Sequence, residues 1–464
     1  MKNYIDKTLK KEIEMAFAFQ LNQNQYQDIK RLVFEISRRQ NTSTPQIINY
    51  LKINSKADKQ TGRNKFFALK DSLVKLRFPL TSTYKNIDRK NIFLNKLKSP
   101  LKNNLTAQDA FRPTTLFFEK KTKGSYLIDN FQNHFPNLKI KQISSLKKYI
   151  KDNKFKLSEL KKPFVFIIKE RRDFLKPCPC TKEHLSCGYW IFNLGFGCPF
   201  DCSYCYLQQY TNSAGIILPA NLDDFFCQFD KFEKKINKPI RIGTGEFCDS
   251  LALDYITNYS TKLISYFRNK SVFFELKTKS NKINNILSQK AASNIIISWS
   301  LNPQKIINSE EAGACGLKER LASAKKIQKS GFKIAFHFDP IIYYENWEKD
   351  YKDLVYQLYA KVKPPLAWIS LGTLRSNRQL KSIVEQRFPR SNIFYGELLI
   401  GEDKKLRYPK FLRKIIYQKM NDWIKEFDQK TPIYLCMEDK DTWKNMGNFK
   451  VSKDIETYLI KSNL

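Results

Sequence analysis

The chain has 464 residues, of which 42% are hydrophobic, and this is enough for two or three domains with full cores. No run approaches the ~18 apolar residues of a membrane span. The N-terminus, MKNYIDKTLKKEIEMAF, lacks the apolar segment and the small-residue cleavage site of a signal peptide. We therefore expect a cytoplasmic protein without a membrane span, in which thiols stay reduced and clustered cysteines indicate metal or redox chemistry.

The formal net charge is +37, from 82 Lys and Arg residues against 45 Asp and Glu residues. Residues 1–176 contain 39 basic and 15 acidic side chains, so most of the excess lies in the N-terminal part. An excess of this size predicts a polyanionic partner, a nucleic acid, bound through phosphate contacts and counterion release. A lysine-biased composition without a binding role is the alternative, and charge alone does not decide between the two.

Residues 1–160 are predicted to form a mostly helical, basic N-terminal region that could bind nucleic acid. TSTPQIINYLK (42–52) has a Ser or Thr N-cap and a proline in its first turn, and NKFFALKDSLVKLRFP (64–79) is an amphipathic segment that ends at a proline. Two short helices in a basic context fit a helix-turn-helix, and a plain helical bundle fits them at least as well.

Strands and helices alternate from about residue 161. The β-rich runs are Phe164–Ile168, Tyr189–Leu194, Ile240–Gly243, Val272–Leu276, Ile295–Ser300, Phe332–Phe338 and Leu366–Leu371. The amphipathic stretches between the later runs are Asn221–Ile236, Leu251–Phe267, Asn281–Lys290, Leu317–Lys329 and Trp347–Val362. This alternation predicts an α/β fold with βαβ units and a parallel sheet.

We expect a partial (β/α)6 barrel over residues 161–380, followed by a C-terminal α/β extension over 381–464 that packs on the barrel. A flat doubly wound sheet is the alternative. In either fold, the residues that carry chemistry gather beyond the C-terminal ends of the strands.

Three cysteines follow the first barrel strand in GFGCPFDCSYCYLQQY (195–210). Cys198, Cys202 and Cys205 have the spacing C-x3-C-x2-C. A structural zinc site needs four ligands, usually from two C-x2-C pairs, and no second pair follows. Thiolates also hold iron–sulfur clusters, normally one per iron. Three cysteines in one loop can therefore hold three corners of a [4Fe–4S] cluster and leave the fourth iron open to a substrate or cofactor.

This loop, with Tyr204 before its last cysteine, resembles the signature of the radical S-adenosylmethionine (radical SAM) enzymes. The resemblance implies that S-adenosylmethionine chelates the open iron. It also implies that an electron from the cluster, supplied by an external donor, splits the cofactor and gives a 5′-deoxyadenosyl radical. Gly243, Gly245 and Glu246 at the end of the second strand look like the family's element that binds the methionine amine. Lys279, after the third strand, could hold the methionine carboxylate. Ser300 and Asn302, after the fourth strand, lie on one face of an extended segment and could hydrogen-bond a ribose.

Elementary chemistry allows these roles and also plainer ones. The carboxylate of Glu246 can pair with an ammonium group and Gly245 lets the backbone approach a ligand, but the same segment suits a tight turn with Asp249 as N-cap. We prefer Lys279 to Lys277 as partner of the methionine carboxylate because Lys279 lies further into its loop. A solvated lysine is the alternative.

The stretch CSYCYLQ (202–208) narrows the resemblance to the spore photoproduct lyase branch and its DNA-repair-photolyase-like relatives. AFHFDPII, SLGTLR and GELLIGEDKKLRYPKFLRKIIYQKM are also similar to that branch, so the resemblance covers about residues 160–440. It implies a lyase that uses the adenosyl radical to reverse a thymine-type photolesion in DNA. Such chemistry requires the damaged bases to leave the base stack and enter the mouth of the barrel.

The segment RIGTGEFCDS departs from that branch. In spore photoproduct lyases a cysteine in this segment donates hydrogen to the product radical, and Glu246 stands at that place here. Cys248 lies two residues further on and faces the same way in an extended segment. We therefore predict Cys248 as the donor, with Tyr204 or Tyr206 as the relay that the resemblance implies. A small buried hydrophobic role is the alternative for Cys248.

Cys178, Cys180, His184 and Cys187 form a further group just before the first barrel strand. Soft or borderline ligands at this density fit a second metal centre, zinc or an auxiliary iron–sulfur cluster. The spacing C-x-C-x3-H-x2-C is unusual for zinc, and free thiols in a structural loop are the interpretation that we prefer.

Two other functions fit the same features. A radical SAM enzyme that modifies tRNA or a peptide would use the same cluster and the same positive charge. A metal-stabilised nucleic-acid-binding protein without catalysis would use the cysteines only as structural ligands. Iron, sulfide and zinc contents separate the last function from the first two.

Overall fold

The computed structural model describes residues 2–79, 81, 111–161, 163–171, 174–180, 184–211, 214–236, 238–444, 446–447 and 449–464. The chain divides into two compact units. The first unit contains residues 1–98 together with two segments from the C-terminal half, 342–347 and 390–400, and the second unit contains the rest. Within the described ranges, no helix is long and apolar enough to cross a bilayer.

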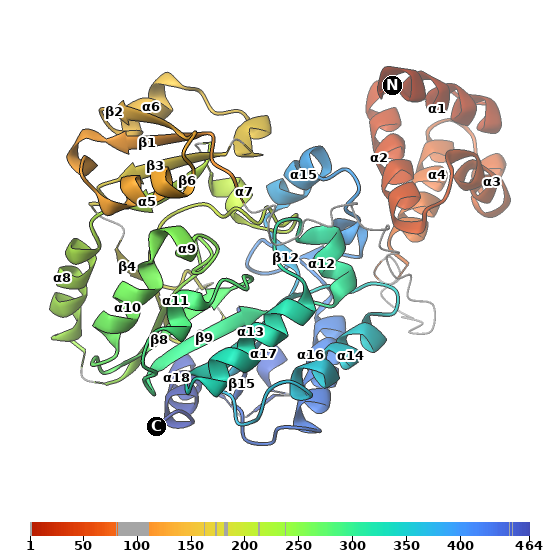
Figure 1. Ribbon diagram of the computed structural model, residues 1–464. Coiled ribbons are helices and arrows are strands. Elements are labelled where there is room, and N and C mark those ends of the chain that lie inside the picture. Colours follow the sequence, from red (N-terminus) through yellow and green to blue (C-terminus); the bar gives the residue numbers. More distant parts are fainter. Residues whose placement is uncertain are drawn as a thin grey trace. The chain divides into compact units, whose positions relative to one another are not determined.

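Four helices of the first unit pack around one apolar core. They are α1 (Lys2–Phe17), α2 (Gln23–Gln40), α3 (Thr44–Asn54) and α4 (Gly62–Arg77) (Figure 1). Ser43 is the N-cap of α3, and α4 ends before Pro79, which cannot continue a helix. Both helices predicted from the sequence are confirmed. Ile36 and Leu69 are fully buried in the shared core, so this unit has the arrangement of the bundle alternative.

Two buried arginines connect these helices to a segment of the C-terminal half within the same unit. Arg39 Nη2 lies 3.3 Å from Glu397 Oε1, and Arg77 Nη2 donates to the carbonyl of Gly396 at 3.3 Å. Buried guanidinium groups require such partners because water does not solvate them. The contacts therefore explain why residues more than 300 positions apart belong to one unit.

The second unit contains a four-stranded parallel sheet with the order β2-β1-β3-β6, whose last strand, β6, lies between two barrel strands in the sequence. Its elements are β1 (Thr115–Glu119), α5 (Tyr126–His134), β2 (Lys139–Ile143), α6 (Leu146–Asp152), β3 (Phe164–Ile168) and β6 (Ile216–Pro219). The prediction of a mostly helical region through residue 160 is therefore wrong for 111–160. The sequence KIKQI of β2 did not indicate a strand because β2 is a largely exposed edge strand, which is fixed by its pairing with β1.

The second sheet has eight strands in the order β15-β11-β10-β9-β8-β7-β5-β4. The strands are β4 (Leu175–Pro177), β5 (Tyr189–Phe192), β7 (Ile240–Thr244), β8 (Val272–Thr278), β9 (Ile295–Ser300), β10 (Lys333–Ile341), β11 (Ile369–Thr373) and β15 (Ile433–Leu435). All the pairs from β5 to β15 are parallel, and β4 is antiparallel to β5. Arg241 Nη2 in β7 reaches the hydroxyl of Tyr434 in β15 at 3.2 Å across four intervening strands, so the sheet is curled. The predicted partial barrel is confirmed.

Helices follow the barrel strands along the chain (Figure 1). They include α8 (Leu222–Glu233), α10 (Tyr259–Phe267), α12 (Gln304–Glu310), α13 (Leu317–Lys329), α14 (Trp347–Tyr359), α15 (Arg378–Arg387), α16 (Lys410–Lys425), α17 (Lys440–Trp443) and α18 (Ser452–Lys461). α10 packs against β8, and α13 packs against β9 and β10. These contacts bury the apolar face of the sheet and leave the C-terminal ends of the strands for the site.

Three expectations change in detail. The stretch predicted as one helix over 251–267 is divided into α9 (Asp254–Thr257) and α10, because Asn258 adopts a left-handed conformation with φ 51°. Of the helix expected over 281–290, only the short α11 (Asn284–Leu287) forms. The C-terminal region does more than pack on the barrel, because its strand β15 pairs with β11 and extends the sheet.

Candidate active site at the mouth of the barrel

A cavity of about 570 Å³ lies at the C-terminal ends of the barrel strands. The segments before and after β5, the ends of β7, β8, β9, β10 and β11, and the segment after β15 contribute to its wall. Eight of the ten cysteines line it: Cys178, Cys180, Cys187, Cys198, Cys202, Cys205, Cys248 and Cys436. Parallel α/β sheets gather their site residues at this edge, so cysteines far apart in sequence meet in one place.

The loop after β5 brings the side chains of Cys198, Cys202 and Cys205 into one packed cluster. Its shape is fixed from within by the carboxamide of Gln208. This group donates to the carbonyls of Cys202, Ser203 and Cys205 at 3.3, 2.8 and 3.2 Å. The loop is therefore held by its own backbone before any metal is considered, and sequence reasoning did not assign Gln208 this role.

A buried ion pair between Glu311 and Arg320 supports the same loop, and both side chains are fully buried. Glu311 also accepts hydrogen bonds from the hydroxyl of Tyr204 and, at 2.9 Å, from Nδ2 of Asn302. Burial alone would raise the pKa of Glu311, but Arg320 and Lys279 outweigh it and the pKa falls to about 2. Tyr204 and Asn302 are thus both held by Glu311, a residue that the sequence analysis missed.

The three thiols fit an iron–sulfur cluster. Burial raises the pKa of Cys198, Cys202 and Cys205, so thiolates here need compensating positive charge. Lys279 acts in that direction on Cys202 and Cys205, and cluster irons supply the same compensation. Among the described residues, no three His, Cys, Asp or Glu side chains are close enough to share one metal ion. In an iron–sulfur cluster each thiolate binds a different iron, so the three thiolates do not have to be close enough to share one ion.

Glu246 lies between two polar side chains at the end of β7. Its carboxylate accepts a hydrogen bond from Lys277 Nζ at 3.0 Å and one from the hydroxyl of Tyr206 at 3.3 Å. The Tyr206 hydroxyl also donates to the Glu246 carbonyl at 2.6 Å. Lys279 is placed differently, with Nζ 5.9 Å from the centre of the Tyr204 ring. The structure pairs Glu246 with Lys277 and places Lys279 near the cluster loop, which is the loop after β5 that contains Cys198, Cys202 and Cys205.

The turn after β7 depends on Asp249 and on two glycines. Asp249 Oδ1 accepts hydrogen bonds from two backbone N–H groups of the turn at 3.0 and 2.9 Å, as expected for the capping role. Gly245 has φ +93°, and a Cβ there would lie 2.6 Å from the carbonyl oxygen of Lys277. A Cβ at Gly243 would lie 2.4 Å from the carbonyl oxygen of Glu275, inside the sheet. Gly245 lines the cavity, whereas Gly243 is required by strand packing.

Cys248 is buried, lines the cavity, and has its pKa raised to about 12 by burial and by Asp249. Tyr204, Tyr206 and Ser300 also line the cavity. Asn302 is not among the residues of the described part that line it, because its amide is engaged by Glu311 and by the hydroxyl of Tyr351. The hydrogen-donor and ribose-binding roles stay predictions.

Two polar pairs complete the cavity wall. His337 Nε2 lies 2.7 Å from Glu275 Oε1, and Trp368 Nε1 donates to the same oxygen at 3.1 Å. Arg375 donates two hydrogen bonds of 2.9 Å to the carboxylate of Asp339. Glu275 could have been found from the sequence, because VFFELKT places a carboxylate inside an apolar strand, where it needs a buried partner.

The four residues grouped just before β5 do not stay together. Cys178, Cys180 and Cys187 line the cavity. His184 does not line it in the described structure. Burial lowers the pKa of His184, and its charged neighbours are Arg407 and Asp403 in the C-terminal region. The described cavity wall therefore contains the three thiols and not the imidazole.

Comparisons with known proteins agree with this arrangement. The family model described as spore photoproduct lyase matches residues 111–434. Spore photoproduct lyases from Geobacillus sp., Clostridium acetobutylicum and Bacillus subtilis are 27%, 26% and 25% identical over 44%, 50% and 48% of this chain. The matched parts span 62%, 69% and 66% of those proteins. The N-terminal helices lie outside the family match.

Two solved structures have the same fold. One is spore photoproduct lyase complexed with dinucleoside spore photoproduct, with a TM-score of 0.60 and 22% identity over 70% of this chain and 99% of that one. The other is a double mutant with bound AdoMet and dinucleoside spore photoproduct, with a TM-score of 0.61 and 22% identity over 71% and 99%. The match of the family model to most of the sequence shows that the chain belongs to the spore photoproduct lyase family of radical SAM enzymes.

Proposed function

We propose that this protein is a radical SAM lyase that reverses a thymine-type photolesion in DNA. The observation that carries the proposal is the convergence of three cysteines from one loop on a cavity that also presents Glu246 and Lys279. Members of the family carry a [4Fe–4S] cluster, and a solved relative holds AdoMet together with the dinucleoside lesion. The resemblance on which the sequence analysis relied is thereby confirmed at the level of the family.

The chain's own residues divide the work as follows. Cys198, Cys202 and Cys205 would hold the cluster, and Lys279 would offset the charge of their thiolates. When bound, the cluster and S-adenosylmethionine supply a carbon-centred radical that abstracts hydrogen. Glu246 would accept hydrogen bonds from the ammonium group of the cofactor. That ammonium group would replace Lys277, the present partner of the Glu246 carboxylate. Released in this way, Lys277 becomes a second cation for the cofactor carboxylate, beside the preferred Lys279.

Hydrogen return to the product requires a thiol near the radical. Cys248 is our proposed donor, since it is buried, protonated at neutral pH and part of the cavity wall. Tyr206 is the proposed relay, because it lines the cavity and its hydroxyl contacts Glu246, two residues from Cys248. Tyr204 is the second candidate, and its hydroxyl donates to the fully buried carboxylate of Glu311.

DNA is the proposed macromolecular substrate, because the net charge of +37 suits a phosphate backbone and the solved relatives hold the dinucleoside lesion. An external electron donor is required to reduce the cluster. We also propose a reducing, cytoplasmic setting, since all ten cysteines are free thiols.

The test is an anaerobic assay of the reconstituted full chain with dithionite, S-adenosylmethionine and dinucleoside spore photoproduct. We expect formation of 5′-deoxyadenosine and loss of the lesion. Cys202→Ala should abolish both, and the matched Cys227→Ser, at an exposed cysteine, should leave both unchanged. Formation of 5′-deoxyadenosine without repair would remove the lyase activity and favour an enzyme acting on tRNA or a peptide. Zinc without acid-labile sulfide would favour a structural metal.

Cys248→Ala tests the donor role in the same assay. We expect lesion consumption to continue while the repaired product gives way to by-products of an unquenched substrate radical. Tyr206→Phe should shift the product distribution in the same direction. Clean repair by Cys248→Ala would exclude Cys248 as the donor.

A further inference from the structure

The wall of the cavity contains a second set of thiols that the proposed reaction does not use. Cys178, Cys180 and Cys187 come from the segment before β5, and Cys436 comes from the segment after β15. The backbone N–H of Cys180 donates to the carbonyl of Cys178 at 2.7 Å, which holds the two cysteines side by side. Cys436 is within electrostatic range of both Cys180 and Cys187. The sequence grouped the first three with His184, and the structure replaces the histidine with Cys436.

These thiols meet where the two edges of the curled sheet approach each other. β4 and β5 form one edge and β15 forms the other. An isolated antiparallel bridge between Leu185 and Glu438 joins the two cysteine-bearing segments, with Leu185 N donating to Glu438 O at 3.2 Å. Backbone contacts therefore hold the segments together without relying on the thiols.

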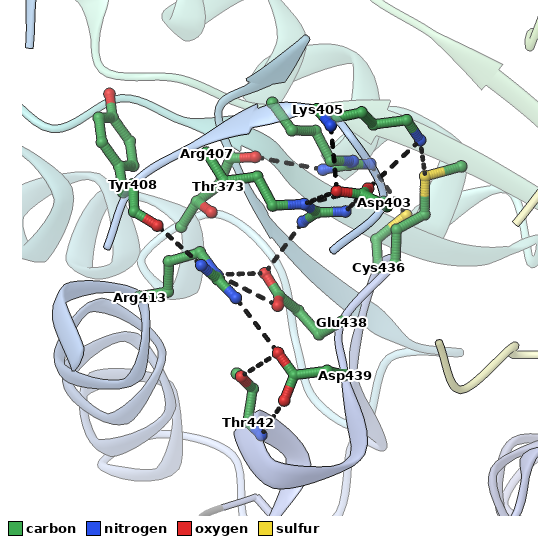
Figure 2. Close-up of polar contacts among 12 residues, drawn as sticks. Thr373, Asp403, Lys405, Arg407, Tyr408, Arg413, Cys436, Glu438, Asp439 and Thr442 are labelled. Carbon is green, nitrogen blue, oxygen red and sulfur yellow. Dashed lines mark hydrogen bonds and ion pairs between the residues drawn. The ribbon is translucent and has the colours of Figure 1, made fainter. Parts of the chain in front are cut away.

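Cys436 lies in a segment that is held by buried ion pairs and by backbone hydrogen bonding. Arg413 donates to both carboxylate oxygens of Glu438 at 3.1 and 3.2 Å, and Arg407 pairs with Asp403 at 2.6 Å (Figure 2). The backbone N–H of Cys436 donates to the carbonyl of Leu371 in β11 at 2.8 Å. A thiol fixed in this way keeps its position toward the cavity and is preorganised as a ligand.

Two buried arginines lie beside these thiols, and Arg241 still has N–H groups without a hydrogen-bond partner although its guanidinium lies over the rings of Trp368 and Tyr434. Arg241 is 1% exposed, its Nε and Nη1 have no hydrogen-bond partner, and Cys187 is one of the groups with which it interacts electrostatically. Arg375 is paired with Asp339 and still directs Nη2 at Cys436 Sγ, at 3.2 Å. An unpaired buried N–H of a guanidinium is costly, and an anionic centre beside Cys187 would satisfy it.

We propose that Cys178, Cys180, Cys187 and Cys436 hold a second metal centre of the thiolate-preferring class, separate from the cluster on Cys198, Cys202 and Cys205. Four thiolates on a zinc ion or on an iron–sulfur cluster form a centre with negative charge, which suits the cations around it. The centre would also link the two edges of the curled sheet, β4 and β5 on one side and β15 on the other. The spacing favours a cluster, because the described thiols are not close enough to share one ion.

The experiment compares metal contents of full-length variants purified anaerobically from cells supplied with iron and zinc. Removing the first cluster with Cys198→Ala/Cys202→Ala/Cys205→Ala should leave about four iron and four sulfide per chain. Iron with sulfide supports the second centre, and zinc without sulfide would contradict a cluster at this place. The triple variant without either metal, yet folded by circular dichroism, would refute the proposal.

The complementary variant is Cys178→Ser/Cys187→Ser/Cys436→Ser, with Cys436→Ser alone as a milder change in case the triple variant does not fold. We expect both to lose the second metal and to keep the electron paramagnetic resonance signal that responds to S-adenosylmethionine. Cys227→Ser should match the wild type in both respects. Unchanged metal contents in these variants would also refute the second centre. This outcome is independent of the proposed lyase activity, which loss of the lesion measures, while the AdoMet-responsive signal reports that the first cluster still binds the cofactor.

Discussion

At the residue scale, the features that position the site are buried charges more than the catalytic motif itself. The cluster loop rests on Glu311 and Arg320, which lie far from it in sequence and are fully buried. The cysteine spacing was sufficient to predict Cys198, Cys202 and Cys205 as ligands, because the spacing follows from the geometry of one loop. The support from Glu311 was not predictable, since a glutamate in EEAGACG has no local sign of a partner.

Replacing Glu311 with glutamine should strongly destabilise the protein. Glu311→Gln leaves the guanidinium of Arg320 buried without a counter-charge, and removing one partner of a buried pair costs about 3–5 kcal/mol. Urea unfolding measures the loss. Glu348→Gln is the matched control, because its pair with Lys419 is half exposed and should contribute less than about 1 kcal/mol. Equal effects of the two changes would contradict the supporting role of Glu311.

The pair of Asp403 and Arg407 predicts a specific pH dependence. Burial alone would raise the pKa of Asp403, but Arg407 lowers it to about 2 from the ordinary 3.8. A lowered pKa gives stability that is complete above about pH 4 and is lost as the pH falls toward 2. Asp403→Asn should therefore lower the unfolding free energy by about 1–2 kcal/mol at pH 7, after solvent screening, and less as the pH approaches 2.

Chemical unfolding at pH 7, 4 and 2.5 checks this dependence. Asp422→Asn, at an exposed aspartate, serves as control and should change stability by less than about 0.5 kcal/mol at every pH. A loss for Asp403→Asn that is the same at all three pH values would show that the ionised carboxylate is not its source.

At the scale of elements, the strands from Tyr189 onward were predicted well because each is a short β-branched or aromatic run between turn residues. Helix boundaries were less accurate where a single residue interrupts the pattern, as Asn258 does between α9 and α10. The strands β1 and β2 were missed because β2 is a largely exposed edge strand that pairs with β1, and β1 pairs on its other side with β3, which comes later in the chain. Local periodicity contains no information about such partners.

Gly245 tests how closely the end of β7 must approach β8. Gly124 and Gly245 both have positive φ, +83° and +93°, so an alanine costs about 1–2 kcal/mol at either position. Gly245→Ala also places its Cβ against the carbonyl of Lys277, and overpacking adds about 1–3 kcal/mol. Nothing lies within 4 Å of a Cβ at Gly124. We expect Gly245→Ala to be the less stable variant and to bind S-adenosylmethionine more weakly, as measured by thermal unfolding and calorimetry.

At the scale of the whole molecule, composition indicated nucleic-acid binding, but the sequence did not indicate how the N-terminal helices are anchored. Arg39 and Arg77 bind Glu397 and Gly396, more than 300 residues away in the chain. The family match begins only at residue 111, so these helices are an addition to the shared fold. These helices are basic, so they contribute to the positive charge from which we predict nucleic-acid binding.

The net charge predicts a steep salt dependence of DNA binding. A protein that contacts 6–10 phosphates loses about 10³–10⁵ in affinity between 50 and 200 mM salt. Fluorescence anisotropy with a lesion-bearing duplex should show a loss of this order. Turnover of the dinucleoside lesion, which does not have the extended phosphate backbone of a duplex, should change little over the same range. If salt does not change the affinity for the duplex, the excess charge does not serve DNA binding and reflects only a lysine-biased composition.

The sequence by itself determined the position of three closely spaced cysteines after the first barrel strand, the parallel strands of the barrel and the family, because each follows from short motifs and local periodicity. Tertiary structure alone decided which carboxylate supports the cluster loop, that Cys436 takes the place of His184 beside three other thiols, and that β15 closes the edge of the sheet. Those relationships depend on segments brought together by burial and charge pairing after the chain has folded, and no local pattern records them.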